Sequence, residues 1–387
     1  MKFKKIISFS LAAFIALPLL GNISNADTIN VERIEGQNRY ETSINVSKEI
    51  EESDYVLIAS GQGYADALIG GTMASQENAP LLLTEKNKLS SGISSEIKRI
   101  NPKEIYILGG EKAISKKVEK ELLSLGFPVR RLHGNDRVKT AKAVSEERLR
   151  LSKLETEGNK NILQAGTYGW NFPDALVAGP FIGIYSSNSE NKQINLELAN
   201  LSLERKKDMY RDTYDWFFGG NGCNSGKTKY FSGKNRYETS ISVADGFKNI
   251  LNKNFDTIIL VSGENYPDAL SASVLSAKYT APILLTPSKT PYKNIANYIK
   301  NNNIKNIIVV GGNRSVDENV VNSYAKKYTT ESDTSTEILG GKIHANKESM
   351  IYHMPGQRYY GKIKVDNLEF FNSEKEAIDA GYRKSMV

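Results

Sequence analysis

A nine-residue phrase, G-x-N-R-Y-E-T-S-I, begins at Gly36 and occurs again at Gly233. A weaker copy, GNDRVKTAKAV, begins at Gly134, so the three starts are 98 and 99 residues apart. This spacing is the size of a small domain and far exceeds one turn of a solenoid. The repeats therefore predict three modules built on one plan.

Modules one and three consist of apolar runs that alternate with segments of helical spacing. In module one the expected strands are 55–60, 79–84 and 104–110, and the expected helices are 65–76, 91–100 and 115–126. Asp66 precedes Gly109 by 43 residues, and Asp268 precedes Gly311 by the same 43, so module three follows the same order. Continuous apolar strands between helices predict an α/β fold, with a parallel sheet flanked by helices in each module.

Module two departs from this plan and is interpreted as degenerate. Polar residues 187–192 stand where the other modules have APLLLT or APILLT. Only 14 residues separate Gly219 from Gly233, compared with 25 between Gly109 and Gly134. We therefore expect module two to lack its last helix and to depend on its neighbours for stability.

The first 26 residues have the pattern of a secretory signal peptide: three lysines, an apolar stretch at 6–20, and small residues at the end. The apolar stretch is shorter than the roughly 20 residues that span a bilayer, so no stable membrane anchor is expected after cleavage. The predicted segments are the signal peptide 1–26, module one 27–133, module two 134–231, module three 232–328, a Ser/Thr-rich linker 329–341 and a small α+β domain 342–387.

Charge and cysteine content narrow the possible partners. The formal net charge is +7, and removing the three lysines of the signal peptide, which contains no acid, lowers it to +4. A mild positive charge favours anionic partners without selecting nucleic acid over a cell wall polyanion. Cys223 is the single cysteine, so the chain can form no intrachain disulfide and no thiolate metal cluster.

Part of the repeated phrase has a structural explanation. Asn38 and Asn235 stand where a helix N-cap is expected, and Glu41 and Glu238 follow three residues later, as in a capping box. In module two Asp136 keeps the cap position, but no acid follows at that spacing. The caps therefore predict helix starts rather than ligands.

Arg39, Arg137 and Arg236 are not explained by the caps. All three modules keep this arginine, whose planar guanidinium suits a carboxylate or phosphate. The alternative is a structural ion pair inside the module, with the Asp of the Asp-Ala-Leu phrase as one possible partner. For any single arginine this structural role is the more common one.

The Asp-Ala-Leu phrase begins at Asp66, Asp174 and Asp268, where an acid stabilises the start of a helix. An acid at this place also opposes a pyrophosphate, which disfavours nucleotide binding. The three histidines form no HExxH motif, and no G-x-S-x-G phrase is present. The sequence thus predicts no cofactor, no metal and no catalytic residue.

Together the phrases R-I-x-G-x-x-R-Y-E-T, D-A-L, A-P-[IL]-L-L-T and the strand ending in G-G resemble cell wall binding repeat type 2 of Gram-positive surface proteins. The resemblance covers about residues 31–328, is specific in modules one and three and is partial in module two. It implies three modules about a pseudo-threefold axis and noncovalent attachment to an anionic secondary polymer of the cell wall. It also implies polymer binding near Leu82, Leu83, Leu284 and Leu285, although these leucines have the pattern of a buried strand.

The candidate polymer-binding residues are Arg39, Tyr40, Asp66, Leu82, Leu83, Arg137, Arg236, Tyr237, Asp268, Leu284 and Leu285. Surface-layer proteins are further possible partners, and nucleic acid is not expected. We expect a secreted, noncatalytic protein of the cell surface. The alternatives are a wall-associated hydrolase of the amidase type, or an accessory subunit of one, and a nucleotide-binding protein, which the loops disfavour.

The C-terminal segment, with Met350–Gly356 and the phrase AGYRK, resembles a small domain at the C-termini of some secreted nucleases and the metal-binding fold of an alkyl-transfer repair protein. Relatives of that domain carry a cysteine where this chain has Gln357, so a thiolate metal site does not carry over. We interpret the segment as an accessory module whose ligand the sequence does not identify.

Overall fold

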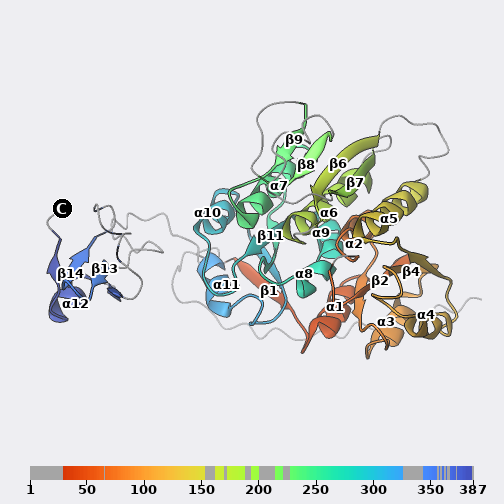
Figure 1. The fold of residues 1–387 in the computed structure, drawn as a ribbon, viewed down its shortest axis with the longest axis horizontal. Helices are drawn as coiled ribbons and strands as arrows, with labels where there is room; N and C mark the ends of the chain where they lie inside the picture. Colours follow the sequence, from red (N-terminus) through yellow and green to blue (C-terminus); the bar gives the residue numbers. More distant parts are fainter. Residues whose placement is uncertain are drawn as a thin grey trace, which may run out of the picture.

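The computed structural model describes residues 29–64, 66–152, 162–169, 172–187, 193–199, 214–220, 227–325, 343–354, 357, 360, 363, 367–371 and 373–385. The predicted signal peptide, the linker and Cys223 lie outside these residues. Three four-stranded parallel sheets with their helices form the main body, and a small mixed sheet belongs to the C-terminal segment (Figure 1). The predicted α/β class, with parallel sheets flanked by helices, is confirmed.

The first sheet has the strand order β3-β2-β4-β5. Its strands are β2 (Tyr55–Ser60), β3 (Leu81–Thr84), β4 (Glu104–Leu108) and β5 (Val129–Leu132). The accompanying helices are α1 (Arg39–Ser47), α2 (Gly70–Gln76), α3 (Ile93–Ile100) and α4 (Lys116–Leu123). Strands β2, β3 and β4 are buried almost throughout, as their continuous apolar sequences predict.

The sheet of module three has the order β1-β12-β10-β11. Its strands are β1 (Asn30–Ile34), β10 (Thr257–Ser262), β11 (Ile283–Thr286) and β12 (Asn306–Val310). The helices are α7 (Arg236–Asn249), α8 (Pro267–Ser271), α9 (Ser273–Tyr279), α10 (Lys293–Asn301) and α11 (Glu318–Ala325). Pro267 occupies the first turn of α8, where its missing N–H costs no hydrogen bond.

Module two has the sheet order β7-β6-β8-β9. It comprises β6 (Ile162–Tyr168), β7 (Gln193–Ala199), β8 (Trp216–Phe218), β9 (Lys229–Phe231), α5 (Arg137–Leu151) and α6 (Phe172–Ser187). The expectation that polar residues replace the second buried strand is wrong, because β7 pairs with β6 as β3 pairs with β2. Helix α6 runs on to Ser187, so the strand begins later in the sequence. Among the described residues no helix lies between β8 and β9.

The sheets are offset from the sequence repeats by one strand. The strand that precedes the repeated phrase at Gly134 or Gly233 joins the sheet of the module before it. Strand β5 pairs with β4, and β9 pairs with β8. Strand β1, at the start of the described residues, pairs with β12 of module three. Figure 1 shows β1, near the start of the chain, beside elements of the third module. The three modules therefore close into a ring.

The offset explains one arginine of the R-I-x-G phrase. Arg33 donates from Nη1 to the Gly311 carbonyl at 2.7 Å and from Nη2 to Glu318 at 2.9 Å. One module further along, Arg131 donates to the Gly109 carbonyl at 2.8 Å and to Glu119 at 3.0 Å. In each case the arginine anchors the last helix of the preceding module. Tyr230 stands at this position after module two, whose described residues contain no such helix.

The three modules share one core. Helices α2, α6 and α9 pack against one another in the middle of the body (Figure 1). Small residues permit this close approach: the Cα of Gly71 lies 3.4 Å from the position of a Cβ built on Gly179. The largest apolar cluster accordingly contains residues from all three modules, whereas the outer sheet faces of modules one and three have their own clusters.

The C-terminal segment forms a mixed sheet of order β15-β13-β14-β16 with one helix. Its elements are β13 (Ile343–Asn346), β14 (Ile351–His353), β15 (Leu368–Phe371), α12 (Glu374–Asp379) and β16 (Arg383–Lys384). Tyr352 and Ala377 lie in its small core. The segment is thus an α+β unit, and its likeness to a nuclease-associated domain stays a prediction.

Candidate functional site

The predicted caps place the three repeated arginines at equivalent positions. The Asn38 side chain accepts hydrogen bonds from the N–H groups of residues 40 and 41, and the Asn235 side chain accepts from those of residues 237 and 238 at the start of α7. Asp136 accepts from the Lys139 N–H at 2.8 Å, so module two keeps its cap. Each cap fixes the start of a helix whose first residue is the arginine: Arg39 in α1, Arg137 in α5 and Arg236 in α7.

Each arginine then reaches the carbonyl of the glycine that follows the first strand after its helix. Arg39 donates from Nη1 to Gly61 at 2.5 Å, and Arg137 donates from Nη1 to Gly169 at 3.0 Å. Arg236 makes the same contact with Gly263. The guanidinium groups therefore lie beyond the carboxyl ends of the parallel strands, where open α/β sheets commonly bind ligands.

Three aromatic residues from equivalent positions meet at this end of the molecule. The ring centroids of Tyr64 and Tyr266 are 5.0 Å apart, those of Tyr64 and Phe172 are 5.8 Å apart, and those of Phe172 and Tyr266 are 5.9 Å apart. Each ring belongs to a different module and is half-buried. We call this group the aromatic triad. Its near-equal spacings are those of a pseudo-threefold axis.

An arginine from the following module lies over two of the three rings of the triad. The guanidinium carbon of Arg137 lies 5.9 Å from the centroid of Tyr64, and that of Arg236 lies 5.6 Å from the centroid of Phe172. Both distances fall within the range of cation–π attraction. Each arginine therefore joins two modules, because it binds a carbonyl of its own module and an aromatic ring of the module before it.

The aspartates of the Asp-Ala-Leu phrase lie beside the triad. A Cβ built on Gly109, Gly219 or Gly311 would collide with Asp66, Asp174 or Asp268 respectively, and all three glycines have positive φ. Burial raises the pKa of Asp174 to about 6, although Arg236 of the next module lowers it. Asp268 accepts from the Ser315 hydroxyl at 2.6 Å. The first glycine of each Gly-Gly pair therefore leaves room for the carboxylate, because it carries no side chain.

The structure separates the other sequence candidates. Tyr40 and Tyr237 are half-buried, and each packs closely against the glycine whose carbonyl the preceding arginine binds. The side chains of the candidate leucines Leu82, Leu83, Leu284 and Leu285 are 0% exposed. A direct contact between these leucines and a polymer is therefore ruled out in this conformation, because they form the core under β3 and β11.

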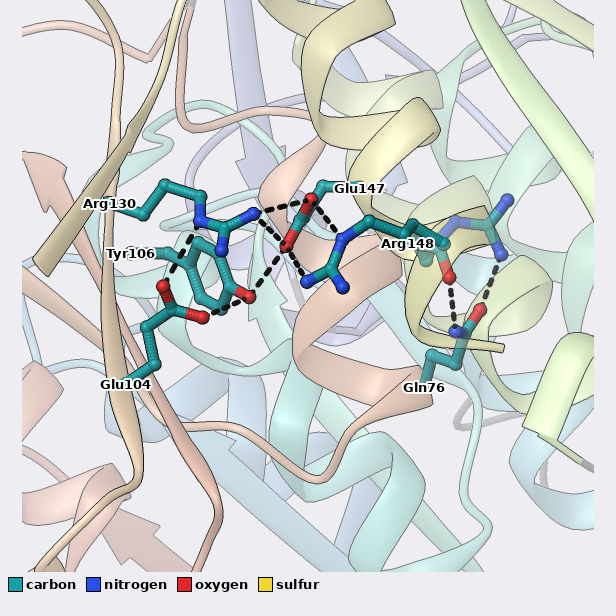
Figure 2. Close-up of polar contacts among 7 residues, drawn as sticks. Gln76, Glu104, Tyr106, Arg130, Glu147 and Arg148 are labelled. Carbon is teal, nitrogen blue, oxygen red and sulfur yellow. Dashed lines mark hydrogen bonds and ion pairs between the residues drawn. The ribbon is translucent and has the colours of Figure 1, made fainter. Parts of the chain in front are cut away.

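A second polar cluster joins modules one and two (Figure 2). The Tyr106 hydroxyl lies 2.8 Å from the Glu104 carboxylate and 2.7 Å from that of Glu147, so the two share its single proton, and Arg130 forms ion pairs with both carboxylates. The Arg150 side chain also donates to Glu147 and, with Tyr106, lowers the pKa of its carboxyl. These contacts therefore hold Glu147 in its charged form at the junction of modules one and two.

On the other side of Glu147, fully buried Arg148 donates from Nη1 to the Gln76 side chain at 2.6 Å (Figure 2). Desolvation lowers the pKa of Arg148 to about 10. This contact ties α5 of module two to the end of α2. Within the part of the chain that the structure describes, no group of three or more His, Cys, Asp or Glu residues could hold a metal ion. The described residues also contain no helix long and apolar enough to cross a membrane.

Sequence reasoning missed Tyr64, Phe172 and Tyr266. A signal was present, because an aromatic residue stands two positions before the Asp of all three Asp-Ala-Leu phrases. Phe172 precedes Pro173 and Tyr266 precedes Pro267, a pattern that also fits residues flanking a helix start. Their meeting depends on how the modules pack, which no local pattern encodes.

Comparison with known proteins supports this architecture. The model of the family "Cell wall binding domain 2 (CWB2)" matches residues 33–119 and 231–321, which belong to modules one and three. N-acetylmuramoyl-L-alanine amidase LytC of Bacillus subtilis is 29% identical over 80% of this chain and 60% of its own length. The amidase enhancer of the same organism is 23% identical over 87% of this chain and 49% of its own length. The chain thus spans only about half to three fifths of these relatives.

Two solved structures share the fold. Cwp6 from Clostridium difficile aligns with a TM-score of 0.58 at 22% identity, over 78% of this chain and 48% of that protein. Cwp8 from the same organism aligns with a TM-score of 0.59 at 24% identity, over 77% of this chain and 51% of that protein. The expected resemblance is therefore confirmed, and the chain carries cell wall binding domain 2 repeats in its first and third modules.

Proposed function

We propose that this protein is a secreted, noncatalytic protein that attaches noncovalently to an anionic polymer of the Gram-positive cell wall. The family match supports association with the wall. The positive net charge of the chain supports an anionic partner. Surface-layer proteins stay possible additional partners.

The observation that carries this proposal is the placement of Arg39, Arg137 and Arg236. All three lie at one end of their sheets and bind equivalent glycine carbonyls. For Arg39 and Arg236 the described residues supply one hydrogen bond each, to Nη1, so the remaining donors of these guanidinium groups suit carboxylate or phosphate groups of a ligand.

The alternative is a wall hydrolase or the accessory subunit of one. It is favoured by the similarity to LytC and to the amidase enhancer. Against it stands the sequence, which contains no HExxH motif and no G-x-S-x-G phrase. A zymogram on wall material, run with the chain alone and with an added amidase, tests both forms of this alternative.

Cosedimentation with purified walls tests the proposal itself. We expect the secreted chain to pellet with intact walls, to be released by salt because charge screening weakens the attraction, and to stay soluble with walls stripped of anionic polymer. Arg39→Gln and Arg236→Gln should weaken binding, whereas Arg383→Gln, at an exposed position of the C-terminal unit, should not. Equal binding to stripped and intact walls would refute the proposal.

A further inference from the structure

We propose that the three modules build one composite site on the aromatic triad, which takes a single acidic sugar residue, instead of one site per module. This inference rests on the proposed function and specifies the ligand and its stoichiometry. Its first support is the convergence of Tyr64, Phe172 and Tyr266, whose ring centroids are all within 5.9 Å of one another. A sugar ring placed on one of them contacts its neighbours too.

The chemistry of the cluster fits a sugar that bears a negative charge. Aromatic rings bind the C–H face of a sugar because both surfaces are apolar, and the half-buried state of the rings leaves part of each accessible. Arg137 and Arg236 lie over two of the rings. An acidic substituent on a stacked sugar would therefore meet guanidinium groups from two modules at once.

Degeneration of module two supplies an independent argument. This module has lost the acid of its capping box, and among the described residues it has no last helix. It nevertheless keeps Arg137, which lies over Tyr64, Phe172 of the triad, and Asp174, whose pKa Arg236 lowers. If each module bound its own ligand, module two could lose these residues without harm to the other two sites. A shared site requires a contribution from every module.

The loops around the triad are open to solvent. Gln62 and Glu264, which follow Gly61 and Gly263, are exposed, and the Tyr266 hydroxyl donates to the Gln62 carbonyl at 3.3 Å. This contact brings a loop of module three to a loop of module one beside the triad. The ligand would thus approach along the axis from the carboxyl ends of the strands.

Isothermal titration calorimetry of the full secreted chain tests the stoichiometry. The probe is the anionic polysaccharide released from Gram-positive walls and hydrolysed to its shortest binding fragment. We expect one fragment per chain. Three fragments per chain, with binding to intact walls retained, would overturn the composite site but leave the proposed function standing. Loss of binding to both walls and fragments would overturn the two together.

Variants of the triad test the location. Phe172→Ala and Tyr266→Ala should each weaken fragment binding at least about ten-fold, because both rings would contact the same sugar. Phe172→Tyr should restore most of the affinity, which separates stacking from folding defects. Phe370→Ala, at an exposed ring of the C-terminal unit, is the control and should change nothing. Unchanged affinity in Phe172→Ala, with a cooperative melting transition, would refute the site.

Discussion

Asn30 and Asn306, which are 276 positions apart, are register partners in adjacent parallel strands, and their side chains share a hydrogen bond of 3.2 Å. Strand β1 is thus an edge strand in the sheet of the last module. Ile34 continues the same pairing with Val310 at the other end of the strand. The stability of module three therefore depends on residues at the start of module one.

Arg33→Ala should destabilise the end of module three. The substitution removes hydrogen bonds to the Gly311 and Val316 carbonyls and an ion pair with Glu318, from a side chain that is only 16% exposed. We expect a loss of roughly 1–3 kcal/mol. Hydrogen exchange should accelerate in β12 and α11, although the substitution lies near the N-terminus.

Arg131→Ala is the matched control for Arg33→Ala. Arg131 makes the equivalent contacts with Gly109, Ile114 and Glu119 in module one. Faster exchange should therefore appear in β4 and α4 while module three keeps its protection. The same exchange pattern in both variants would contradict the closed ring.

Gly109→Ala should destabilise the protein much more than Gly110→Ala. Gly109 has φ of +106°, and a Cβ there would lie 2.8 Å from the carboxylate of Asp66. Gly110 has ordinary φ, and a Cβ there would meet nothing within 4 Å. We expect roughly 1–3 kcal/mol for the first change and almost none for the second. Equal losses of unfolding free energy in the two variants, measured by urea unfolding, would exclude the proposed role of the first glycine.

Asp174 predicts a specific pH dependence of stability. Its pKa in the folded state, about 6, lies above the 3.8 of an ordinary aspartate because burial disfavours the charged form. The folded state then binds the proton more tightly than the unfolded state. The contribution of Asp174 to the free energy of unfolding therefore falls as pH rises from about 4 to 6. The full difference is roughly 3 kcal/mol. Thermal melts of Asp174→Asn should lack this decline, and a slope identical to that of the unaltered chain would disprove the assignment.

Glu147→Gln should weaken the contact between modules one and two. The carboxylate accepts from Tyr106, Arg130 and Arg150 and is 8% exposed. We expect a loss of roughly 1–2 kcal/mol in urea unfolding. The neighbouring Glu146 pairs with Lys142 at the surface, with 61% exposure, so Glu146→Gln should cost almost nothing. A large effect of Glu146→Gln would show that helix α5 itself is sensitive.

The local structure of modules one and three followed from sequence because it depends on local forces. Strand β2 occupies the predicted residues 55–60, and Asn38 and Asn235 cap their helices as expected. Helix α2 was predicted from residue 65 but begins at Gly70. In module two the long helix α6 places strand β7 later in the sequence than in the other modules. The mixed sequence of β7 did not predict a strand, and only its pairing with β6 in the structure identifies it.

The site was predictable only in part. The three arginines were found because they repeat, and their common orientation follows from the caps. The aromatic triad was not found, since the approach of Tyr64 to Tyr266 depends on contacts 202 residues apart. The leucine phrase was found, and the structure confirms its pattern of a buried strand, while polymer binding near it stays a prediction.

The one-strand offset between repeats and sheets makes this chain a covalent counterpart of a cyclic homotrimer. Each module lends a strand to the module before it, which is a head-to-tail interface that closes only when the rotation per module completes a circle. If one whole repeat were removed, each remaining sheet could still receive a strand from another module. Two modules could not complete the circle, however, because the rotation per module suits three. Such a shortened chain should exchange β1 between molecules, so the number of repeats decides between a monomer and a polymer.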